Sequence, residues 1–257
     1  MSEKKDSIFR TFLVAFLTCA LCSVFVSSAA VVLRPIQQRN QELFKNKNIL
    51  LACGLMERGE KVSADDVVRR LENVRVLKVN LATGDVVATG EEAKQYDERT
   101  AAKTAGESVE ISDPVGLPTR GKFGTVYVAL DANGKTGRIV LPIVGKGLWS
   151  ILYGFLALDA DANTIGSLIF YDHGETAGLG GEIENPNWQK GWVGKKAFKG
   201  DVPAVRVVKG PGMDEYSVDG ISGATLTDNG VNHTVHYWLK QYQPFLKKFM
   251  EEGENAK

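Results

Sequence analysis

The sequence predicts an α+β protein, in which a single N-terminal transmembrane helix is followed by a mostly antiparallel sheet domain with flanking helices. The first observation is an uncharged apolar run at residues 11–33, and the second is a series of short segments with strand-like apolar patterns. The third is one apolar stripe at helical spacing near the carboxyl end. A chain of 257 residues suffices for one anchor and one main soluble domain.

The charge balance argues against a nucleic-acid partner. The 31 Lys and Arg residues cancel the 31 Asp and Glu residues, so no global basic field attracts a phosphate backbone. The cysteines Cys19, Cys22 and Cys53 all precede the hydrophilic body and do not form a disulfide framework for it. Cys19 and Cys22 form a C-x-x-C within the apolar run, where helix packing explains them better than a metal or redox site.

Residues 11–33 are predicted to span a membrane. They carry no charge, are bracketed by Arg10 and Arg34, and reach the length of about 20 residues that crosses the hydrocarbon core. A cleavable signal peptide is the less favoured alternative, because its apolar region is shorter. Basic residues flank both ends in nearly equal number, so charge alone does not decide the orientation.

Two helices are expected before the sheet. Residues 35–51 are rich in Gln, Asn and Lys and carry apolar residues at helical spacing, which predicts a helix continuing away from the membrane. Ser63, followed three residues later by Asp66, is a capping-box-like start for a short helix over residues 63–71.

The sheet is expected from a change to strand patterns. The predicted strands are residues 74–81, 125–130, 138–144, 150–158 and 164–171. The turn sequences DANG at 131–134 and DADAN at 159–163 let the chain reverse, so neighbouring strands should be antiparallel. The polar segment 91–118 is expected to be a long loop with little regular structure.

A terminal helix is predicted over residues 228–250, packed on the sheet. Pro244 within it predicts a kink or a break, and Thr227 or Asp228 is the expected N-cap. The apolar stripe consists of Val231, Val235, Trp238, Leu239, Tyr242, Leu246 and Phe249.

Three glycine-rich loops follow predicted strands, where binding groups tend to be presented on a rigid scaffold. They are residues 144–150 (VGKGLWS), 173–183 (HGETAGLGGEI) and 219–227 (DGISGATLT). The third precedes the terminal helix, whose unpaired N–H groups and positive dipole end suit a phosphate. Thr225 lies within about one turn of that end, and capping leaves Ser222 and Thr225 for another purpose.

Residues 219–225 (DGISGAT) resemble the D-x-x-[ST]-G-A-T flavinylation signature of the FMN-binding domain family, in which the last threonine is joined to FMN by a phosphoester bond. Residues 175–180 (ETAGLG) are similar to that family's second signature, E-T-P-G-L-G, with Ala177 in place of proline. Together with the anchor and the length, these signatures resemble the family of C subunits of the Na+-translocating NADH:quinone reductase. The resemblance covers nearly the whole chain, and Ala177 should leave its loop less rigid.

The resemblance implies an electron carrier with FMN bound covalently to Thr225 and no catalytic residues of its own. It implies a separate flavin transferase that supplies FMN from FAD, because threonine is a poor nucleophile. It also implies a single-pass protein of the bacterial inner membrane, with residues 1–10 as a cytoplasmic tail, residues 11–33 as the transmembrane helix and residues 34–257 as a periplasmic FMN-binding domain. The implied partners are subunits A, B, D, E and F, with electrons arriving from an iron–sulfur centre and leaving to an FMN on the B subunit.

The resemblance also implies which residues surround the flavin. Ser222, Gly223, Ala224 and Thr227 should lie around the phosphate on Thr225. The other expected FMN-binding residues are Glu175, Thr176, Gly178, Leu179 and Gly180, with Lys146 and Trp149 closing one side.

Other candidate residues carry weaker signals. His233 and His236 lack a third metal ligand nearby, so no metal site is predicted. Nothing in the sequence sets the pKa values of Asp172, Glu182 and Glu184 apart, which argues against a hydrolase. His173 is expected to shape the flavin loop, and Trp188 and Trp192 are expected to pack a loop onto the body.

Two alternatives stay open. The G subunit of the Rnf complex shares the flavin signature and the anchor, but the long insertion between the first helices and the later strands favours the quinone reductase. The second alternative is an anchored periplasmic binding module, which would use the same glycine loops for a noncovalent ligand or only for assembly.

Overall fold

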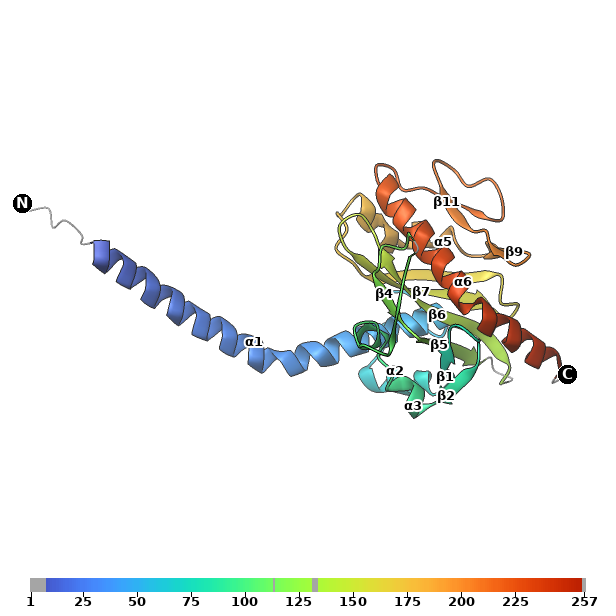
Figure 1. Cartoon of the computed structure of the whole chain (residues 1–257), viewed down its shortest axis with the longest axis horizontal. Helices are drawn as coiled ribbons and strands as arrows, with labels where there is room; N and C mark the ends of the chain where they lie inside the picture. The colour runs from blue at the N-terminus through green and yellow to red at the C-terminus, as the bar shows by residue number, and fades with distance from the viewer. Residues whose placement is uncertain (1–7, 113, 131–133, 256–257) are drawn as a thin grey trace, which may run out of the picture. The chain divides into compact units, whose positions relative to one another are not determined.

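The computed structural model describes residues 8–112, 114–130 and 134–255, and the chain divides into two compact units, residues 1–44 and 45–257 (Figure 1). Residues 131–133 of the predicted DANG turn lie outside the described residues, as do residues 1–7 of the predicted cytoplasmic tail.

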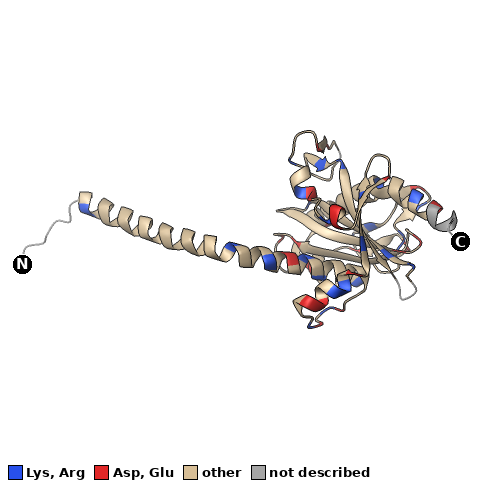
Figure 2. Ribbon diagram, turned by 90° about the horizontal axis from the view of Figure 1, so that it is seen from below, with Lys and Arg blue, Asp and Glu red and all other residues tan. Residues whose placement is uncertain are grey.

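The first unit is formed by helix α1, Ile8–Cys53, whose last nine residues belong to the second unit. The predicted helices over residues 11–33 and 35–51 are confirmed, but they form one continuous helix that passes through Pro35. Figure 2 shows the long stretch of α1 without charged residues. Large apolar side chains such as Phe12, Phe16 and Phe25 are exposed along it. Among the described residues, α1 is the one helix long and apolar enough to cross a membrane, and it fits a membrane anchor.

The second unit is built on a six-stranded sheet with the order β2-β1-β5-β6-β7-β8, in which every neighbouring pair is antiparallel. The five predicted strands are confirmed, with ends within two residues of the predicted ones. Strand β2 was missed because it has only four residues and three of them are exposed. The strands are β1 (Val74–Asn80), β2 (Val86–Thr89), β5 (Phe123–Leu130), β6 (Thr136–Lys146), β7 (Ile151–Asp159) and β8 (Ile165–Asp172).

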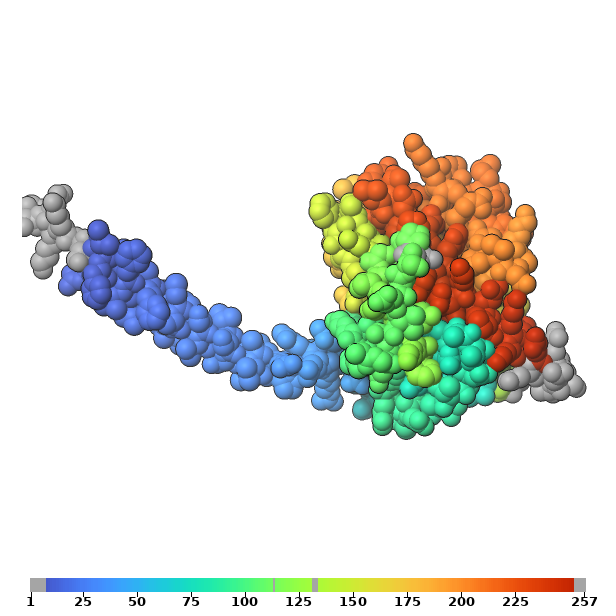
Figure 3. Space-filling model, in the orientation of Figure 1, coloured from blue at the N-terminus to red at the C-terminus, as the bar shows by residue number. Residues whose placement is uncertain are grey.

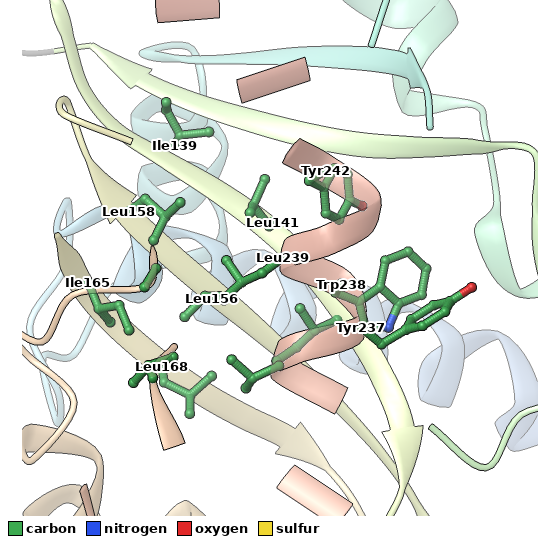
Figure 4. Close-up of a cluster of buried hydrophobic side chains, with 14 of the residues drawn as sticks. Ile139, Leu141, Leu156, Leu158, Ile165, Leu168, Tyr237, Trp238, Leu239 and Tyr242 are labelled. Atoms are coloured by element: carbon green, nitrogen blue, oxygen red, sulfur yellow. The ribbon is translucent and has the colours of Figure 1, made fainter. Parts of the chain in front are cut away.

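Helix α6, Thr225–Asn255, covers one face of the sheet with the predicted apolar stripe. In Figure 4, Leu239 of α6 lies next to Leu141 and Leu156 of the sheet, and Trp238 lies beside Tyr237. The helix begins three residues before the predicted start at residue 228, because the Asp228 N–H already donates to the Ala224 carbonyl oxygen at 2.9 Å.

Pro244 does not split α6, so the predicted break is wrong and the alternative, a kink, stays a prediction. Tyr242 and Phe245, on either side of the proline, are both fully buried. The Tyr242 hydroxyl also donates to the Thr125 carbonyl oxygen at 3.2 Å. Packing on the sheet therefore stabilises the helix on both sides of Pro244, although the proline removes one helical hydrogen bond.

The end of α1, residues 45–53, packs on the opposite face of the sheet. Ala52 and Cys53 are buried there, and the Ala52 carbonyl oxygen accepts a hydrogen bond from the Ser167 hydroxyl at 3.2 Å. Helix α2, Ala64–Leu71, follows, and its predicted cap is confirmed, since the Ser63 side chain accepts from the Asp66 N–H at 3.1 Å. Both faces of the sheet are thus covered by helix.

The polar segment 91–118 contains more regular structure than predicted. Its elements, including a strand just beyond it, are α3 (Glu91–Lys94), α4 (Glu98–Ala101), β3 (Ser108–Glu110) and β4 (Thr119–Gly121). These elements are too short for a periodic signal, but the buried side chains of Ala93, Ala101 and Val115 anchor the segment. Figure 3 shows this green region beside the red α6, to which Arg120 is tied by a 3.0 Å hydrogen bond from its Nε to the Tyr237 hydroxyl.

The polar side of α6 holds the segment that follows β8. The Asn232 side chain accepts from the Val207 N–H at 2.7 Å and donates to the Val207 carbonyl oxygen at 3.0 Å. A ring nitrogen of His236 contacts the Val205 carbonyl oxygen, and Gln243 donates to that of Asp201 at 2.6 Å. The segment comprises η1 (Gly180–Glu184), α5 (Pro186–Lys190), β9 (Phe198–Lys199), β10 (Val202–Pro203), β11 (Arg206–Val208) and β12 (Ser217–Asp219).

Replacing Asn232 by leucine is expected to lower the free energy of unfolding by about 1–3 kcal/mol, because the buried N–H and C=O of Val207 both lose their partner. Urea denaturation of the purified chain measures the loss. The matched control is Asn229→Leu on the same helix, because Asn229 is exposed. Equal stability of the two variants would contradict the proposed anchoring by Asn232.

Candidate functional site

The three glycine-rich loops converge at one end of the sheet. Residues 144–150 join β6 to β7, residues 173–183 follow β8, and residues 219–227 run into the start of α6. In Figure 3 the yellow-coloured part of the chain lies beside the orange-red start of α6. Helix α6 touches the end of strand β6 here, since a Cβ atom added to Gly230 of α6 would lie 2.4 Å from the carbonyl oxygen of Lys146 on β6.

The Glu175 carboxylate connects all three loops. Its Oε1 accepts hydrogen bonds from the Trp149 and Ser150 N–H groups, each at 3.0 Å, and from the Ser150 hydroxyl at 3.1 Å. Its Oε2 accepts from the Leu148 N–H at 3.2 Å and from the Thr227 hydroxyl at 2.8 Å. One buried side chain therefore fixes the β6–β7 loop, its own loop and the first turn of α6 against one another.

Five hydrogen bonds keep this carboxylate charged inside the protein. Burial raises the pKa of Glu175, but the bonds from the Thr227 hydroxyl and from the N–H groups of Trp149, Ser150 and Leu148 outweigh burial, and the net pKa lies below its usual range. The ionised form is the one that accepts all five bonds. The carboxylate faces inward to the loops, and the expected place of Glu175 near the flavin stays a prediction.

The loop around Glu175 is also braced from within. The Glu175 N–H donates to Nδ1 of His173 at 3.2 Å, which confirms that His173 shapes this loop. The Thr176 carbonyl oxygen accepts from the Leu179 N–H at 3.1 Å, so what Leu179 presents outward is its half-exposed side chain. Gly180 is buried, and a Cβ atom there would lie 2.4 Å from the Thr227 hydroxyl oxygen, which requires glycine.

The hydroxyl residues around the start of α6 differ in their exposure to solvent. Thr225, the first residue of the helix, is exposed, whereas Thr227 is 1% exposed and donates to Glu175. Ser222 and Gly223 are exposed in the preceding turn, where Gly223 has a positive φ of 77°, and Ala224 is buried. Of the three expected hydroxyls, only those of Ser222 and Thr225 therefore face outward.

Asp228 lies under this turn and is not the N-cap, nor is Thr227. Both residues belong to the first turns of α6, which begins at Thr225. The Asp228 Oδ2 accepts a hydrogen bond from the Ile221 N–H at 3.0 Å. Burial raises the pKa of Asp228 to about 6, although the Ile221 N–H opposes this shift.

Exposed apolar side chains surround the start of α6. They come from Leu148 and Trp149 in the first loop, Leu179 in the second and Leu226 next to Thr225, and Trp149 is 72% exposed. Leu179 lies against Gly223, whose added Cβ would be 3.1 Å from the Leu179 side chain. Such a group of apolar side chains around an anion-binding helix end suits a ligand with a phosphate and a planar apolar ring.

Lys146 and Thr176 stand at the margin of this region. The Lys146 side chain is exposed and its stem lies against Gly116, where an added Cβ would be 2.6 Å from the Lys146 Cβ. Because Gly145 abuts Thr234 on α6, strand alternation directs the Lys146 side chain away from α6. Thr176 and Gly178 are exposed, so their polar groups are accessible to a ligand.

Asp172, Glu182 and Glu184, which the sequence did not support as catalytic groups, each have a partner in the structure. Asp172 pairs with Arg99 at 3.1 Å, and Oε2 of Glu182 accepts from the Asn185 amide at 2.6 Å. Glu184 lies 3.5 Å from Nε2 of His173.

The two tryptophans of the following loop pack it onto the body, as predicted. Trp192 is fully buried, and the rings of Trp188 and Trp192 lie 5.7 Å apart in an edge-to-face arrangement. The Trp188 Nε1–H donates to the Asp219 carbonyl oxygen at 2.8 Å, and this bond secures the start of the 219–227 loop.

Sequence patterns did not single out Ser150, Leu148, Leu226 or a buried role for Asp228. Their contributions depend on which loops meet in space, and the spacing of residues within one loop does not predict that. The single available signal was the T-x-x-D pattern from Thr225 to Asp228, which places the two side chains on one helix face.

Comparisons with known proteins show the family of this chain. Residues 147–240 match the family model described as FMN-binding domain. The C subunit of the Na(+)-translocating NADH-quinone reductase of Haemophilus ducreyi is 43% identical over 252 residues, which cover 95% of each chain. The protein of the same name from Vibrio parahaemolyticus is 40% identical, over 99% of this chain and 100% of the relative.

Solved structures give the same answer for the fold. The crystal structure of Shewanella oneidensis NqrC has a TM-score of 0.74 and 32% identity, covering 80% of this chain and 96% of that one. The corresponding C subunit from Parabacteroides distasonis has a TM-score of 0.65 and 30% identity, covering 83% and 96%. The chain therefore belongs to the family of C subunits of the Na+-translocating NADH-quinone reductase, and is a flavoprotein component of that oxidoreductase complex.

Proposed function

We propose that this chain relays electrons within the Na+-translocating NADH:quinone reductase through an FMN joined to Thr225 by a phosphoester bond. The observation that carries the proposal is the placement of Thr225, an exposed threonine at the first position of the 31-residue helix α6. The helix dipole and the free N–H groups of the first turn stabilise a phosphate at that position.

Exposure and hydrogen bonding select Thr225 over its neighbours. Thr227 is buried, and its hydroxyl is engaged by Glu175, so a modifying enzyme cannot reach it. Ser222 is exposed but lies in the turn before the helix, three residues from the first helical N–H groups. Thr225 alone in this loop combines an accessible hydroxyl with the helix end.

The two buried carboxyl groups at this site, those of Glu175 and Asp228, are not free to act as a general base for the modification of Thr225. The Glu175 carboxylate already accepts five hydrogen bonds, and the Asp228 carboxyl group is buried beneath residues 221–224. Because threonine is a poor nucleophile, attachment would use a flavin transferase that activates the Thr225 hydroxyl. With FAD as donor, the Thr225 Oγ–phosphorus bond forms as the pyrophosphate bond breaks, AMP leaves, and the hydroxyl proton is released.

The apolar side chains around Thr225 supply a place for the flavin ring. Bound FMN accepts and passes on electrons one or two at a time, while the protein sets its position and surroundings. Trp149, Leu148, Leu179 and Leu226 would exclude water from one side of the ring. Ser222, Gly223 and the exposed backbone of Gly178 would bind polar groups of the cofactor.

Orientation and partners complete the proposal. Residues 11–33 would cross the inner membrane, residues 1–10 would stay in the cytoplasm and residues 34–257 would lie in the periplasm, where the flavin transferase acts. The name of the relatives, a C subunit, supports assembly with subunits A, B, D, E and F. Electrons would arrive from an iron–sulfur centre and leave to the FMN of the B subunit.

Replacing Thr225 by valine is expected to abolish attachment, since valine keeps the shape of threonine and lacks the hydroxyl. Mass spectrometry of the peptide that spans residues 222–227 should show one added FMN in the wild type only when the transferase is present, and none in Thr225→Val. In-gel flavin fluorescence should report the same loss.

The matched control for this experiment is Ser222→Ala, which removes the other exposed hydroxyl of the loop and should keep FMN on Thr225. An FMN mass retained in Thr225→Val, or found on Ser222 or Thr227, would refute the proposed attachment site.

Replacing Glu175 by glutamine is expected to lower the free energy of unfolding by about 1–3 kcal/mol at pH 7, because an amide cannot accept all five hydrogen bonds of the carboxylate. The pKa of Glu175 is lowered in the folded protein, so this stabilisation is present above pH 4.5 and is lost as the pH falls through the folded pKa. Urea denaturation at pH 7 and below pH 4.5 measures the difference.

The exposed Glu184→Gln is the control for Glu175→Gln and should change stability little at either pH. A wild-type advantage over Glu175→Gln that stays constant into acid would show that the charge of Glu175 does not hold the loops together.

A further inference from the structure

Within the described part of the chain, three buried side-chain polar atoms have no hydrogen-bond partner: Nε2 of His173, Nε1 of Trp192 and Oδ1 of Asp228. His173 still lies 3.5 Å from Glu184, and Trp192 is packed in the core against Trp188. Asp228 differs because it is a carboxyl group, only 8% exposed, at the N-terminal end of the long helix α6.

A buried carboxylate oxygen without a partner is costly while the group is ionised and much less so when it carries a proton. Oδ2 of Asp228 is satisfied by the Ile221 N–H, so Oδ1 is the natural position for the proton. Burial is the largest cause of the raised pKa of about 6, and no charged side chain contributes to it.

The charged groups of the surrounding elements are few. Asp219 comes from the preceding loop, where its carboxylate accepts from the Gly212 N–H at 2.7 Å. Lys209 follows β11, and Glu175 is reached through Thr227. The backbone of Lys146 touches Gly230, but its charged side chain is directed away from α6. None of these charges shifts the pKa of Asp228. No neighbouring cation therefore offsets the effect that a new negative charge would have on this pKa.

Thr225 and Asp228 are three residues apart on α6 and so lie on the same helix face, with about 5–6 Å between Cβ atoms. A phosphoester on Thr225 carries a negative charge at every physiological pH. At this separation, with one partner buried, like charges raise the pKa of a carboxyl group.

We propose that Asp228 is a proton-binding residue of the flavin-attachment site, which takes up one proton when a phosphoryl anion is joined to Thr225. This inference rests on the proposed function. Near neutral pH, Asp228 is ionised in the unmodified site. In the modified site Asp228 is protonated and neutral, and the phosphoester carries the negative charge. The proton comes from solvent, and no electrons move. By linkage, protonated Asp228 favours attachment as much as attachment favours protonation.

The test follows the Asp228 carboxyl carbon by NMR during a pH titration of the full chain in detergent micelles, made in cells with or without the flavin transferase. Asp228→Asn identifies the signal by removing it. We expect a midpoint near pH 6 without FMN and at least tenfold tighter proton binding with FMN attached. The same midpoint in both forms would overturn the inference.

Mass spectrometry of the same samples separates this inference from the proposed function. If FMN is attached to Thr225 and the midpoint does not move, only the role of Asp228 fails. If no FMN is found on Thr225 with the transferase present, the proposed function fails and this inference falls with it.

A stability measurement gives a second reading of Asp228. A raised pKa means that the folded chain binds more protons, so its stability is full below pH 3.8 and is lost as the pH rises through about 6. Asp228→Asn should therefore melt at a higher temperature than the wild type at pH 8, and the gain should vanish below pH 3.8, where Asp228 is protonated in both the folded and the unfolded chain. The exposed Asp214→Asn, whose pKa is lowered rather than raised, should show no such gain. An Asp228→Asn chain that gains nothing at pH 8 would overturn the inference.

Discussion

The end of the sheet where the three glycine-rich loops meet depends on one buried carboxylate, that of Glu175. Glu175 belongs to one of the three glycine-rich loops, and its carboxylate accepts hydrogen bonds from the other two. Two of these loops connect or follow strands, and the third leads into α6, so the Glu175 contact also joins sheet to helix. The bond of Glu175 to the Thr227 hydroxyl holds the first turn of α6 with Thr227 buried, and Thr225 is exposed.

Helix α6 connects the three loops to the rest of the sheet domain. Its apolar stripe packs on the sheet through Trp238, Leu239 and Tyr242, while Asn232 on its polar side carries a short strand that ends near the 219–227 loop. The contact of Gly230 with β6 brings the helix close to the strand at the site. The loops therefore sit on elements that are themselves rigid, as a site that must place a cofactor requires.

The periodic elements were predictable from sequence because each contains enough turns or alternations to show a period. This holds for α1, for five of the six sheet strands and for the stripe of α6. The four-residue strand β2 and the short elements in residues 91–118 have no measurable period, and their burial depends on distant partners. The start of α6 was misplaced for a related reason, because the Thr227 hydroxyl that suits a cap is used by Glu175, 52 residues away in the chain.

The site itself could be located from two short motifs, but its internal contacts could not. The motifs name Glu175 and Thr225, whereas the direction in which Glu175 faces and the burial of Asp228 depend on how three loops meet. The two carboxyl groups then differ in role because their environments differ. Five donors hold Glu175 in its ionised form, and one donor leaves Asp228 near the balance between its two forms. Under the proposed roles, Glu175 must stay ionised to hold the loops, whereas Asp228 must take up a proton when a phosphoryl anion is attached. One carboxyl group cannot do both, because it cannot keep its charge and also exchange a proton.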